Sequence, residues 1–279
     1  MAATAGLLAT SKANAITNTE VQNNKFKGNI NHSVCRWCYN TIPMEDFLQN
    51  LNELGITAMD LTGPDDWPIM KKYGIHASMC WGAGFGIEKG WTDAKLHEEL
   101  IKDYLQMIPK VAEAGYTNLI CFSGNRNGMN EEEGLKNSAK GLKQIMAVAE
   151  KHGVVIQMEL LNSKVDHKDY MCDNVEWGVS LCNEISSENF KLLYDIYHMQ
   201  IMEGDIIRTI RDYHQYFGHY HTGGNPGRHE INETQELYYP AIMKAIVETG
   251  FKGYVAQEFI PSWEDKIAAL KEGVTICDI

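Results

Sequence analysis

The segment Gly153-Val154-Val155-Ile156-Gln157-Met158-Glu159 connects the end of a helical pattern to a short run of β-branched and apolar residues. A glycine placed directly after a helix ends it in the left-handed conformation, and a short apolar run of this kind is typical of a buried strand. The same succession of helical pattern, glycine and strand-like run recurs at residues 55–58, 74–77, 115–118 and 250–253. Strands that alternate with helices in this way predict βαβ units and a parallel sheet.

Extending this pattern along the chain gives eight strands and eight helices. The predicted strands are residues 32–37, 57–61, 75–80, 117–122, 154–159, 190–195, 216–221 and 253–258. The predicted helices are residues 43–54, 65–73, 93–114, 131–152, 173–185, 204–213, 235–249 and 264–275. Eight such pairs fit an α/β fold of the (β/α)8 TIM-barrel type, although counting alone leaves an open, doubly wound sheet as an alternative. No linker or change in composition divides residues 28–279, so we expect one barrel domain there.

The composition limits the class of partner. The 279 residues carry a formal net charge of −12, which argues against a nucleic-acid partner because such binding depends on Lys and Arg that neutralise phosphates. No run approaches the ~18 apolar residues of a membrane-spanning helix. We therefore expect a small-molecule substrate, and the sequence leaves open whether the chain forms a homo-oligomer.

The first residues differ in character from the rest. Residues 2–10 are small and mostly apolar, and Ala13-Asn14-Ala15 is similar to the cleavage site of an export signal. The basic region that should precede such a signal is missing, so we interpret residues 1–15 either as the end of a longer signal or as an Ala-rich tail. The first interpretation predicts an exported, periplasmic protein and the second a cytoplasmic one. Residues 16–27 are expected to be flexible.

The seven cysteines are scattered, and most lie in or beside apolar runs, where a thiol behaves as a small apolar side chain. Their odd number and spacing do not indicate a disulfide framework. Cys35 and Cys38 form a C-x-x-C motif, but no second pair is present to complete a tetrahedral zinc site. We expect these cysteines to be structural.

Four successive predicted strands, from the fifth to the eighth, end in a side chain that can bind a metal ion. These are Glu159, Asp195, His221 and Glu258. A single carboxylate or histidine at a strand end is more often a helix cap or a rim residue, but four in succession are hard to explain in that way. The carboxyl ends of barrel strands form the active-site face, so we predict a metal site there. His219, on the same face of its strand, is expected to pack beneath His221.

Three carboxylates and one imidazole form an oxygen-rich ligand set. This set favours Mg²⁺ or Mn²⁺, with Co²⁺ or Zn²⁺ admissible because of the imidazole. A divalent cation can act as a Lewis acid on the carbonyl of an α-hydroxy ketone. Glu159 and Glu258 are then the candidates to remove and return a proton as an enediol forms.

Further candidates lie in the loops that follow the strands. Arg228, after the seventh strand, can pair with a carboxylate or phosphate of the substrate. His198 follows Asp195 by three residues and is placed in a loop, and Asn162 belongs to a polar loop after Glu159. The glycine-rich residues 81–86 predict a flexible loop, with Trp81 and Phe85 lining the pocket.

These residues lead to a resemblance with a known family. The chain resembles the hydroxypyruvate isomerases, within the xylose isomerase-like barrel superfamily of sugar isomerases and epimerases. The resemblance is carried by Tyr194-Asp195-Ile196-Tyr197-His198-Met199-Gln200-Ile201-Met202-Glu203-Gly204-Asp205, by Pro226-Gly227-Arg228-His229-Glu230 and by Gln257-Glu258-Phe259.

The resemblance implies roles for individual residues. Glu159, Asp195 and Glu258 take the positions of metal ligands, Glu159 and Glu258 those of the acid/base pair, and His198 and Arg228 those of substrate contacts. The asparagine of the E-x-x-N segment is kept as Asn162, whereas the family's proline after the glutamate is Leu160 here. His221 stands where hydroxypyruvate isomerases typically carry glutamine, and an imidazole there is similar to the ketose 3-epimerases.

The expected function is that of a divalent-metal-dependent isomerase of small α-hydroxy carbonyl compounds. The favoured reaction converts hydroxypyruvate into 2-hydroxy-3-oxopropanoate (tartronate semialdehyde) through an enediol, which is an intramolecular oxidoreduction. A ketose 3-epimerase with the same metal site is the first alternative, and a dehydratase of a keto-inositol or related sugar is the second. A non-catalytic sugar-binding barrel is disfavoured because both candidate acid/base glutamates are present.

Overall fold

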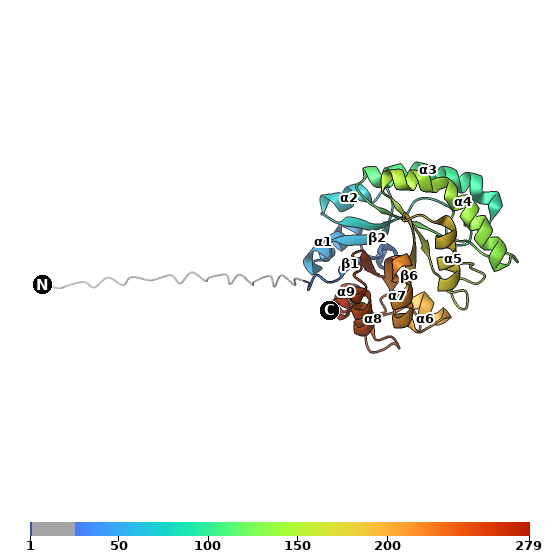
Figure 1. The fold of residues 1–279 in the computed structure, drawn as a ribbon. Helices are drawn as coiled ribbons and strands as arrows, with labels where there is room; N and C mark the ends of the chain where they lie inside the picture. The colour runs from blue at the N-terminus through green and yellow to red at the C-terminus, as the bar shows by residue number, and fades with distance from the viewer. Residues whose placement is uncertain (2–25) are drawn as a thin grey trace.

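The computed structural model describes Met1 and residues 26–279, and in this part of the chain eight parallel strands form one barrel-shaped sheet (Figure 1). The order β1-β8-β7-β6-β5-β4-β3-β2 brings the first strand beside the last, and a bridge between Cys35 and Asp60 joins the end of β1 to β2. The prediction of a (β/α)8 barrel is therefore confirmed, and the open sheet is excluded. The strands are β1 (Asn31–Val34), β2 (Ala58–Thr62), β3 (His76–Cys80), β4 (Asn118–Cys121), β5 (Val155–Glu159), β6 (Phe190–Asp195), β7 (Phe217–Thr222) and β8 (Tyr254–Gln257).

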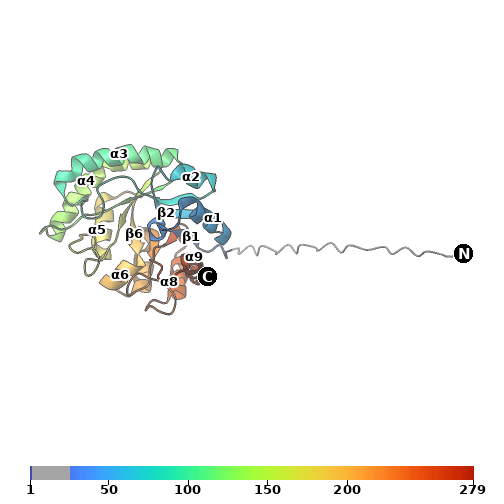
Figure 2. The same ribbon diagram turned by 180° about the vertical axis from the view of Figure 1, so that it is seen from behind.

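The helices surround the strands in chain order, as the two opposite views in Figures 1 and 2 show. Their apolar faces and the apolar strand residues form one continuous core. The α-helices of the described residues are α1 (Met44–Leu54), α2 (Trp67–Lys72), α3 (His97–Glu113), α4 (Glu131–His152), α5 (Val175–Ile185), α6 (Ile196–Met202), α7 (Ile206–Tyr213), α8 (Tyr239–Glu248) and α9 (Lys266–Cys277).

The ends of α4 illustrate how the local sequence determines the repeated succession of helix, glycine and strand. The side chain of Asn130 accepts a hydrogen bond from the backbone N–H of Glu133, which caps the start of the helix. Gly153 ends the helix with a φ of +65°, a conformation that favours glycine. The chain then enters β5 at Val155, so the predicted succession of helix, glycine and strand is confirmed here.

Two short elements at the carboxyl ends of strands differ from the prediction. The first strand stops at Val34, and Arg36–Tyr39 forms a 3-10 helix instead of continuing the strand to residue 37. After β6 the chain enters α6 at once, because the carboxylate of Asp195 accepts a hydrogen bond from the backbone N–H of His198 at 3.1 Å and caps the helix. His198 therefore lies in a helix, and its predicted position in a loop was wrong.

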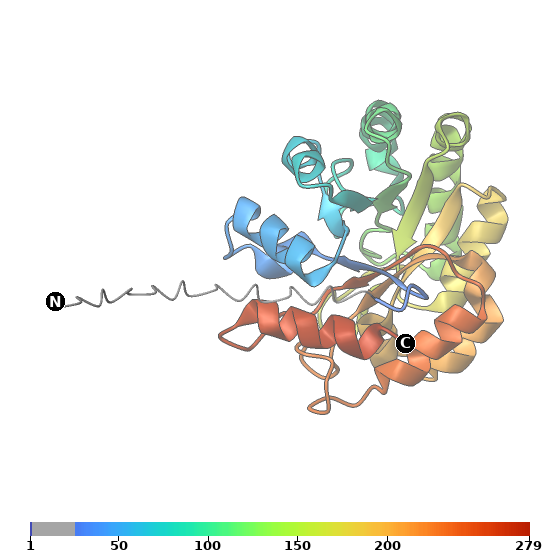
Figure 3. The ribbon, with the colours of Figure 1, turned by 90° about the vertical axis from the view of Figure 1, so that its left-hand side faces the viewer.

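The beginning and the end of the described barrel lie together, as Figure 3 shows for the C-terminal helix α9 beside α1. The backbone N–H of Lys27 donates to a carboxylate oxygen of Asp278 at 3.0 Å, and the Lys266 ammonium donates to the hydroxyl of Thr41 at 3.1 Å. The predictions for residues 2–25, including the export signal, fall outside the described residues. Among the helices of residues 26–279, none is long and apolar enough to span a membrane.

Candidate active site

The four predicted metal ligands meet at the carboxyl ends of β5 to β8. Asp195, the last residue of β6, is in register with His221 on β7, while Glu159 ends β5 and Glu258 follows β8 directly. All four side chains are buried, and one potential ligand atom from each lies within 4.8 Å of the others. The strand register thus brings together residues that are up to about a hundred positions apart in the chain.

The imidazole of His221 lies at the centre of this group. Its Nδ1 is 2.7 Å from Oε2 of Glu258, 3.2 Å from Oε1 of Glu159 and 3.9 Å from Oδ2 of Asp195. Its other nitrogen, Nε2, is 2.7 Å from Oδ2 of Asp60. A carboxylate that accepts a hydrogen bond from one ring nitrogen of a histidine fixes the orientation of the ring. It also fixes the tautomer, so that the other nitrogen carries no proton and can bind a metal.

Asp60 is a site residue that the sequence analysis missed. It lies within β2, is fully buried, and contacts both His221 and the Nε2 of His219, the latter at 3.1 Å. The hydroxyl of Ser78 donates to its Oδ1, and the thiol of Cys35 is 3.7 Å from its Oδ2. A lone aspartate within an otherwise apolar strand was the available signal. His219 packs beneath His221, as predicted.

The acidic groups of the cluster have different proton affinities. Burial raises the pKa of Glu159, and it raises the pKa of Asp195 to about 7 even though Arg228 opposes the shift. Burial also acts on Glu258, but His221 and Arg228 outweigh it and hold its pKa well below the usual range. For His221 burial lowers the pKa, yet Glu258 and the hydrogen bond to Asp60 raise it well above the ordinary value.

Arg228 is the cation of the site. Its Nη2 donates to Glu258 at 2.5 Å and to Asp195 at 3.1 Å, and its Nε donates to the backbone carbonyl of Glu258 at 3.2 Å. The guanidinium lies between the rings of Trp37 and Tyr197, at 5.4 and 5.2 Å from their centroids. These contacts hold the guanidinium of Arg228 in a largely buried position beside the cluster.

His198 and Asn162 lie behind Arg228, and neither is among the residues that line the cavity. Nη1 of Arg228 donates to Nε2 of His198 at 2.9 Å, and burial together with Arg228 lowers the pKa of His198 well below its usual value. Nδ1 of His198 lies 3.2 Å from the backbone nitrogen of Asn162, whose side-chain oxygen accepts the N–H groups of Val165 and Asp166. His198 thus contacts Arg228 directly and Asn162 contacts it through His198, and the role of the two residues in substrate binding stays a prediction.

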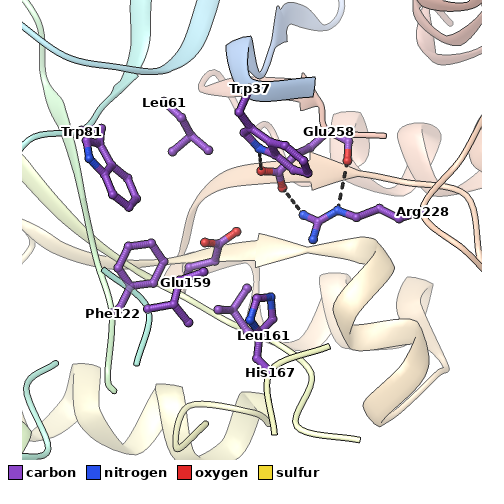
Figure 4. A pocket seen from close by; sticks show the side chains of 10 residues that line it. Trp37, Leu61, Trp81, Phe122, Glu159, Leu161, His167, Arg228 and Glu258 are labelled. Atoms are coloured by element: carbon purple, nitrogen blue, oxygen red, sulfur yellow. Dashed lines mark hydrogen bonds and ion pairs between the residues drawn. The ribbon is translucent and has the colours of Figure 1, made fainter. Parts of the chain in front are cut away.

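The cluster opens into a cavity of about 450 Å³ (Figure 4). Glu258 and Arg228 lie on one side of it, the predicted Trp81 lines the other, and Glu159 lies between them. Phe85 is 40% exposed and lies outside the cavity, which corrects its predicted position. The cavity is lined by Trp37, Leu61, Trp81, Ile87, Phe122, Glu159, Leu161, His167, Arg228 and Glu258.

Trp37 is a second site residue that was missed. Its position in a 3-10 helix places the indole over the cavity, where its Nε1 donates to Oε1 of Glu258 at 2.7 Å (Figure 4). The adjacent C-x-x-C motif forms no disulfide, and all seven cysteines are buried free thiols. Burial raises the pKa of Cys35 well above the usual value, in agreement with a structural role.

The donor set fits a divalent cation. Three buried carboxylates converge on one imidazole nitrogen, and the guanidinium of Arg228 offsets only part of their charge. A buried carboxylate group of this kind requires a compensating cation, and an oxygen-rich set with one nitrogen suits a hard or borderline divalent ion. Glu159, Asp195, His221 and Glu258 are the residues that could hold it.

Comparison with curated proteins finds isomerases. The chain is 27% identical to the hydroxypyruvate isomerase of Escherichia coli K12 over 183 residues, which cover 65% of this chain and 69% of that protein. It is 31% identical to the 2-oxo-tetronate isomerase of Cupriavidus necator over 109 residues, 39% of this chain. The matched part spans 41% of that protein's length and a similar share of several other curated relatives.

Solved structures with the same fold have lower sequence identity. The family 2 AP endonuclease from Brucella melitensis has a TM-score of 0.77 and 20% identity, covering 88% of this chain and 96% of that one. D-psicose 3-epimerase from Clostridium cellulolyticum H10 has a TM-score of 0.71 and 17% identity, covering 90% and 100%. A structure described with a bound zinc atom has a TM-score of 0.70 and 16% identity, covering 89% and 95%.

These structural similarities show the fold alone. The family evidence comes from the sequence, because residues 67–275 match the family described as xylose isomerase-like TIM barrel. That match covers most of the chain, and the chain therefore belongs to the xylose isomerase-like TIM barrel family.

Proposed function

We propose that the chain is a divalent-metal-dependent isomerase of small α-hydroxy carbonyl compounds, with hydroxypyruvate as reference substrate and 2-hydroxy-3-oxopropanoate as product. The observation that carries the proposal is the buried cluster of Glu159, Asp195, His221 and Glu258, two of whose glutamates also line the cavity. The relatives named hydroxypyruvate isomerase and 2-oxo-tetronate isomerase support an isomerase of this class.

The cation is proposed to be Mg²⁺ or Mn²⁺, with Co²⁺ or Zn²⁺ compatible with the imidazole. When bound, it would polarise the substrate carbonyl as a Lewis acid. His221 has to bind it as a neutral imidazole through Nδ1, and the contact between Nε2 and Asp60 favours the tautomer with the proton on Nε2. The zinc atom in one structure of the same fold supports a metal site of this kind.

The two glutamates are proposed to transfer the proton. Two carboxyl groups whose environments push their pKa values apart are suited to act as acid and base, and Glu159 and Glu258 are shifted in opposite directions. Glu258, held ionised by His221 and Arg228, takes the proton from the carbon that bears the hydroxyl group. Glu159, which protonates more readily, supplies a proton to the neighbouring carbonyl carbon. The former carbonyl oxygen gains a proton and the former hydroxyl oxygen loses one, so that carbonyl and hydroxyl exchange places with no net change in composition.

Arg228 is proposed to hold the carboxylate of the substrate. Its guanidinium lines the cavity beside both Glu258 and the aromatic ring of Trp37, and a fork of N–H donors matches a carboxylate. His198 and Asn162 then act as positioning residues, because their contacts limit the guanidinium to one orientation.

A ketose 3-epimerase is the second candidate, and His221 is the observation that favours it. An imidazole at this position is similar to the epimerases, and the fold is shared with D-psicose 3-epimerase. The same proton transfer at a carbon beside the carbonyl would then invert that carbon instead of moving the carbonyl.

The test is to assay the purified protein with Mn²⁺ against hydroxypyruvate and against a panel of ketoses that includes D-psicose and D-fructose. We expect metal-dependent formation of 2-hydroxy-3-oxopropanoate, and its loss when EDTA removes the metal. Turnover of ketoses alone would contradict the hydroxypyruvate assignment and favour the epimerase. Metal binding without turnover of either class would contradict both.

A further inference from the structure

The cavity has two chemically different ends, which point to the kind of substrate it accepts. The charged end consists of Glu159, Glu258 and Arg228, and the apolar end consists of Leu61, Trp81, Ile87 and Phe122. Figure 4 shows Trp81 and Phe122 across the cavity from Arg228, with Glu159 between them. In the proposed function the charged end holds the reacting carbons and the carboxylate. The apolar end is then available to contact a part of the substrate that does not react.

The apolar end depends on the conformation of the backbone as well as on the identity of the side chains. Leu61 has a φ of +55°, which is rare for a side chain larger than glycine, and the pairing of β2 with β3 shifts register between Asp60 and Thr62. In a regular strand neighbouring side chains face opposite sides, whereas here Asp60 reaches His221 and Leu61 lines the cavity. A strained conformation that adds an apolar side chain to a cavity wall indicates a functional requirement.

The aromatic residues of this end leave a large apolar surface uncovered. The rings of Trp81 and Phe122 lie 5.6 Å apart at 59°, and Trp81 is 38% exposed. Apart from the indole N–H of Trp81, the side chains of this end offer no hydrogen-bond donor or acceptor. Hydroxyl groups buried here without a side-chain partner are disfavoured, whereas an apolar ring would remove this surface from water.

The size of the cavity agrees with a substrate larger than a three-carbon acid. Its volume of about 450 Å³ falls within the ~300–1,000 Å³ of pockets that bury ligands of drug size. We therefore infer that the preferred substrate is a 3-hydroxy-2-oxo acid that carries a ring-sized apolar group on C4, seated against Trp81 and Phe122. This inference rests on the proposed function, and it extends that function from the reacting head to the remainder of the substrate.

The chemistry is the same isomerisation on a longer compound. Glu258 removes the proton from C3, and the oxygen on C2 takes up a proton to give the enediol of C2 and C3. Glu159 then supplies a proton to C2, and the hydroxyl on C3 releases its proton as it becomes the carbonyl. The product is the 2-hydroxy-3-oxo acid, in which C3 is oxidised, C2 is reduced, and no other reactant is consumed. The apolar group takes no part in the reaction and contributes binding only.

The experiment compares two substrates that share the head and differ in the tail, 3-hydroxy-2-oxo-4-phenylbutanoate and 3,4-dihydroxy-2-oxobutanoate, with the Mn²⁺-loaded enzyme. Burial of a phenyl ring should raise kcat/KM by about tenfold to a hundredfold over the dihydroxy compound. Trp81→Ala should lower this ratio by about tenfold. Phe85→Ala is the matched control, because Phe85 lies on the same loop outside the cavity, and it should leave the ratio unchanged.

A binding measurement separates this inference from the proposed function. Unreactive 2-oxo-4-phenylbutanoate and 2-oxobutanoate are titrated calorimetrically into the wild type and the Trp81→Ala variant. One outcome is that the phenyl compound binds more tightly in a way that depends on Trp81 while neither hydroxy acid is turned over. This result would support the proposed role of the apolar end in binding and contradict the proposed isomerase function. Equal or faster turnover of the dihydroxy compound, or equal binding of the two oxo acids, would overturn the inference.

Discussion

The two halves of the barrel end their strands in opposite ways. Glu159 and Asp195 end β5 and β6, His221 is the second-last residue of β7, and Glu258 follows β8 directly. All four side chains can bind a cation or a proton. Near the carboxyl end of each of β1 to β4 a large apolar side chain lines the same cavity. Trp81 and Phe122 follow β3 and β4 directly, Leu61 is the second-last residue of β2, and Trp37 lies in the 3-10 helix after β1. The second half carries the candidate chemistry, and the first half shapes the space in which it acts.

Asp60 and Trp37 connect the two halves. Asp60 belongs to β2, yet its carboxylate contacts the imidazole of His221 on β7, and Trp37 donates a hydrogen bond to Glu258. Substitutions in the second half should therefore change the rate or the metal affinity, whereas substitutions in the first half should change the choice of substrate, unless they touch Asp60 or Trp37.

The largest effect is expected for Glu258→Gln. The amide keeps the shape of the side chain and can still accept the Trp37 hydrogen bond, but it can neither take a proton nor neutralise a cation. Loss of a general base typically costs about 10²–10⁴-fold in rate, so kcat for hydroxypyruvate should fall by that amount. Glu264→Gln, at an exposed glutamate, is the control. A Glu258→Gln enzyme that is folded by thermal melting and retains most of its activity would contradict the assignment.

Asp60→Asn should weaken metal binding by about 10–100-fold, the usual effect of removing a carboxylate that orients a histidine ligand. Calorimetric titration of the variant and the wild type with Mn²⁺ measures this loss of metal affinity. Cys35→Ala is a matched control, because the thiol is 3.9 Å from Nε2 of the same histidine but has no proposed role. If Cys35→Ala weakened metal binding as much as Asp60→Asn, the thiol would have to be included in the site.

Arg228→Lys keeps the positive charge and removes the fork of donors. The KM for hydroxypyruvate should rise by about tenfold to a hundredfold, because a bidentate charge-assisted contact is lost. The KM for dihydroxyacetone, which has no carboxylate, should rise much less. Steady-state kinetics on both compounds checks this, and an equal rise for the two would show that Arg228 does not bind the carboxylate.

The effect expected for pH is graded, because it depends on how far the pH lies below 7. Burial raises the pKa of Asp195 to about 7, so below pH 7 a metal has to displace the proton on this carboxyl. Metal affinity should therefore fall by about tenfold per pH unit below pH 7, and more steeply if His221, whose pKa is also raised, loses its proton in the same step. Titrations with Mn²⁺ between pH 5.5 and 8 test whether the metal affinity falls as the pH is lowered. An affinity that is constant over this range would contradict it.

The contrast between the halves also explains what the sequence could predict. Glu159, Asp195, His221 and Glu258 stand out because each is a polar residue at the end of an apolar strand, and the register of a parallel barrel brings such ends together. The barrel itself was predictable for a related reason, since glycines such as Gly153 mark the helix ends.

The first half offered weaker signals, namely the glycine-rich residues 81–86 beside Trp81 and the lone Asp60 in an apolar strand. Trp37 and Leu61 look like core residues in the sequence, and their positions depend on a 3-10 helix and on a positive φ. The helix that contains His198 is only seven residues long and begins at a side-chain cap, so no hydrophobic periodicity predicted it. Tertiary contacts determine the positions of these side chains, and such contacts cannot be read from a single sequence.

The most direct test of the metal-assisted proton transfer is solvent deuterium exchange. Hydroxypyruvate is incubated with the Mn²⁺-loaded protein in D₂O, and deuterium bound to carbon in substrate and product is followed by NMR. We predict incorporation that requires the metal and is lost in Glu258→Gln. Turnover without incorporation would contradict transfer through exchangeable glutamates, and exchange that persists after removal of the metal or in Glu258→Gln would contradict the proposed site.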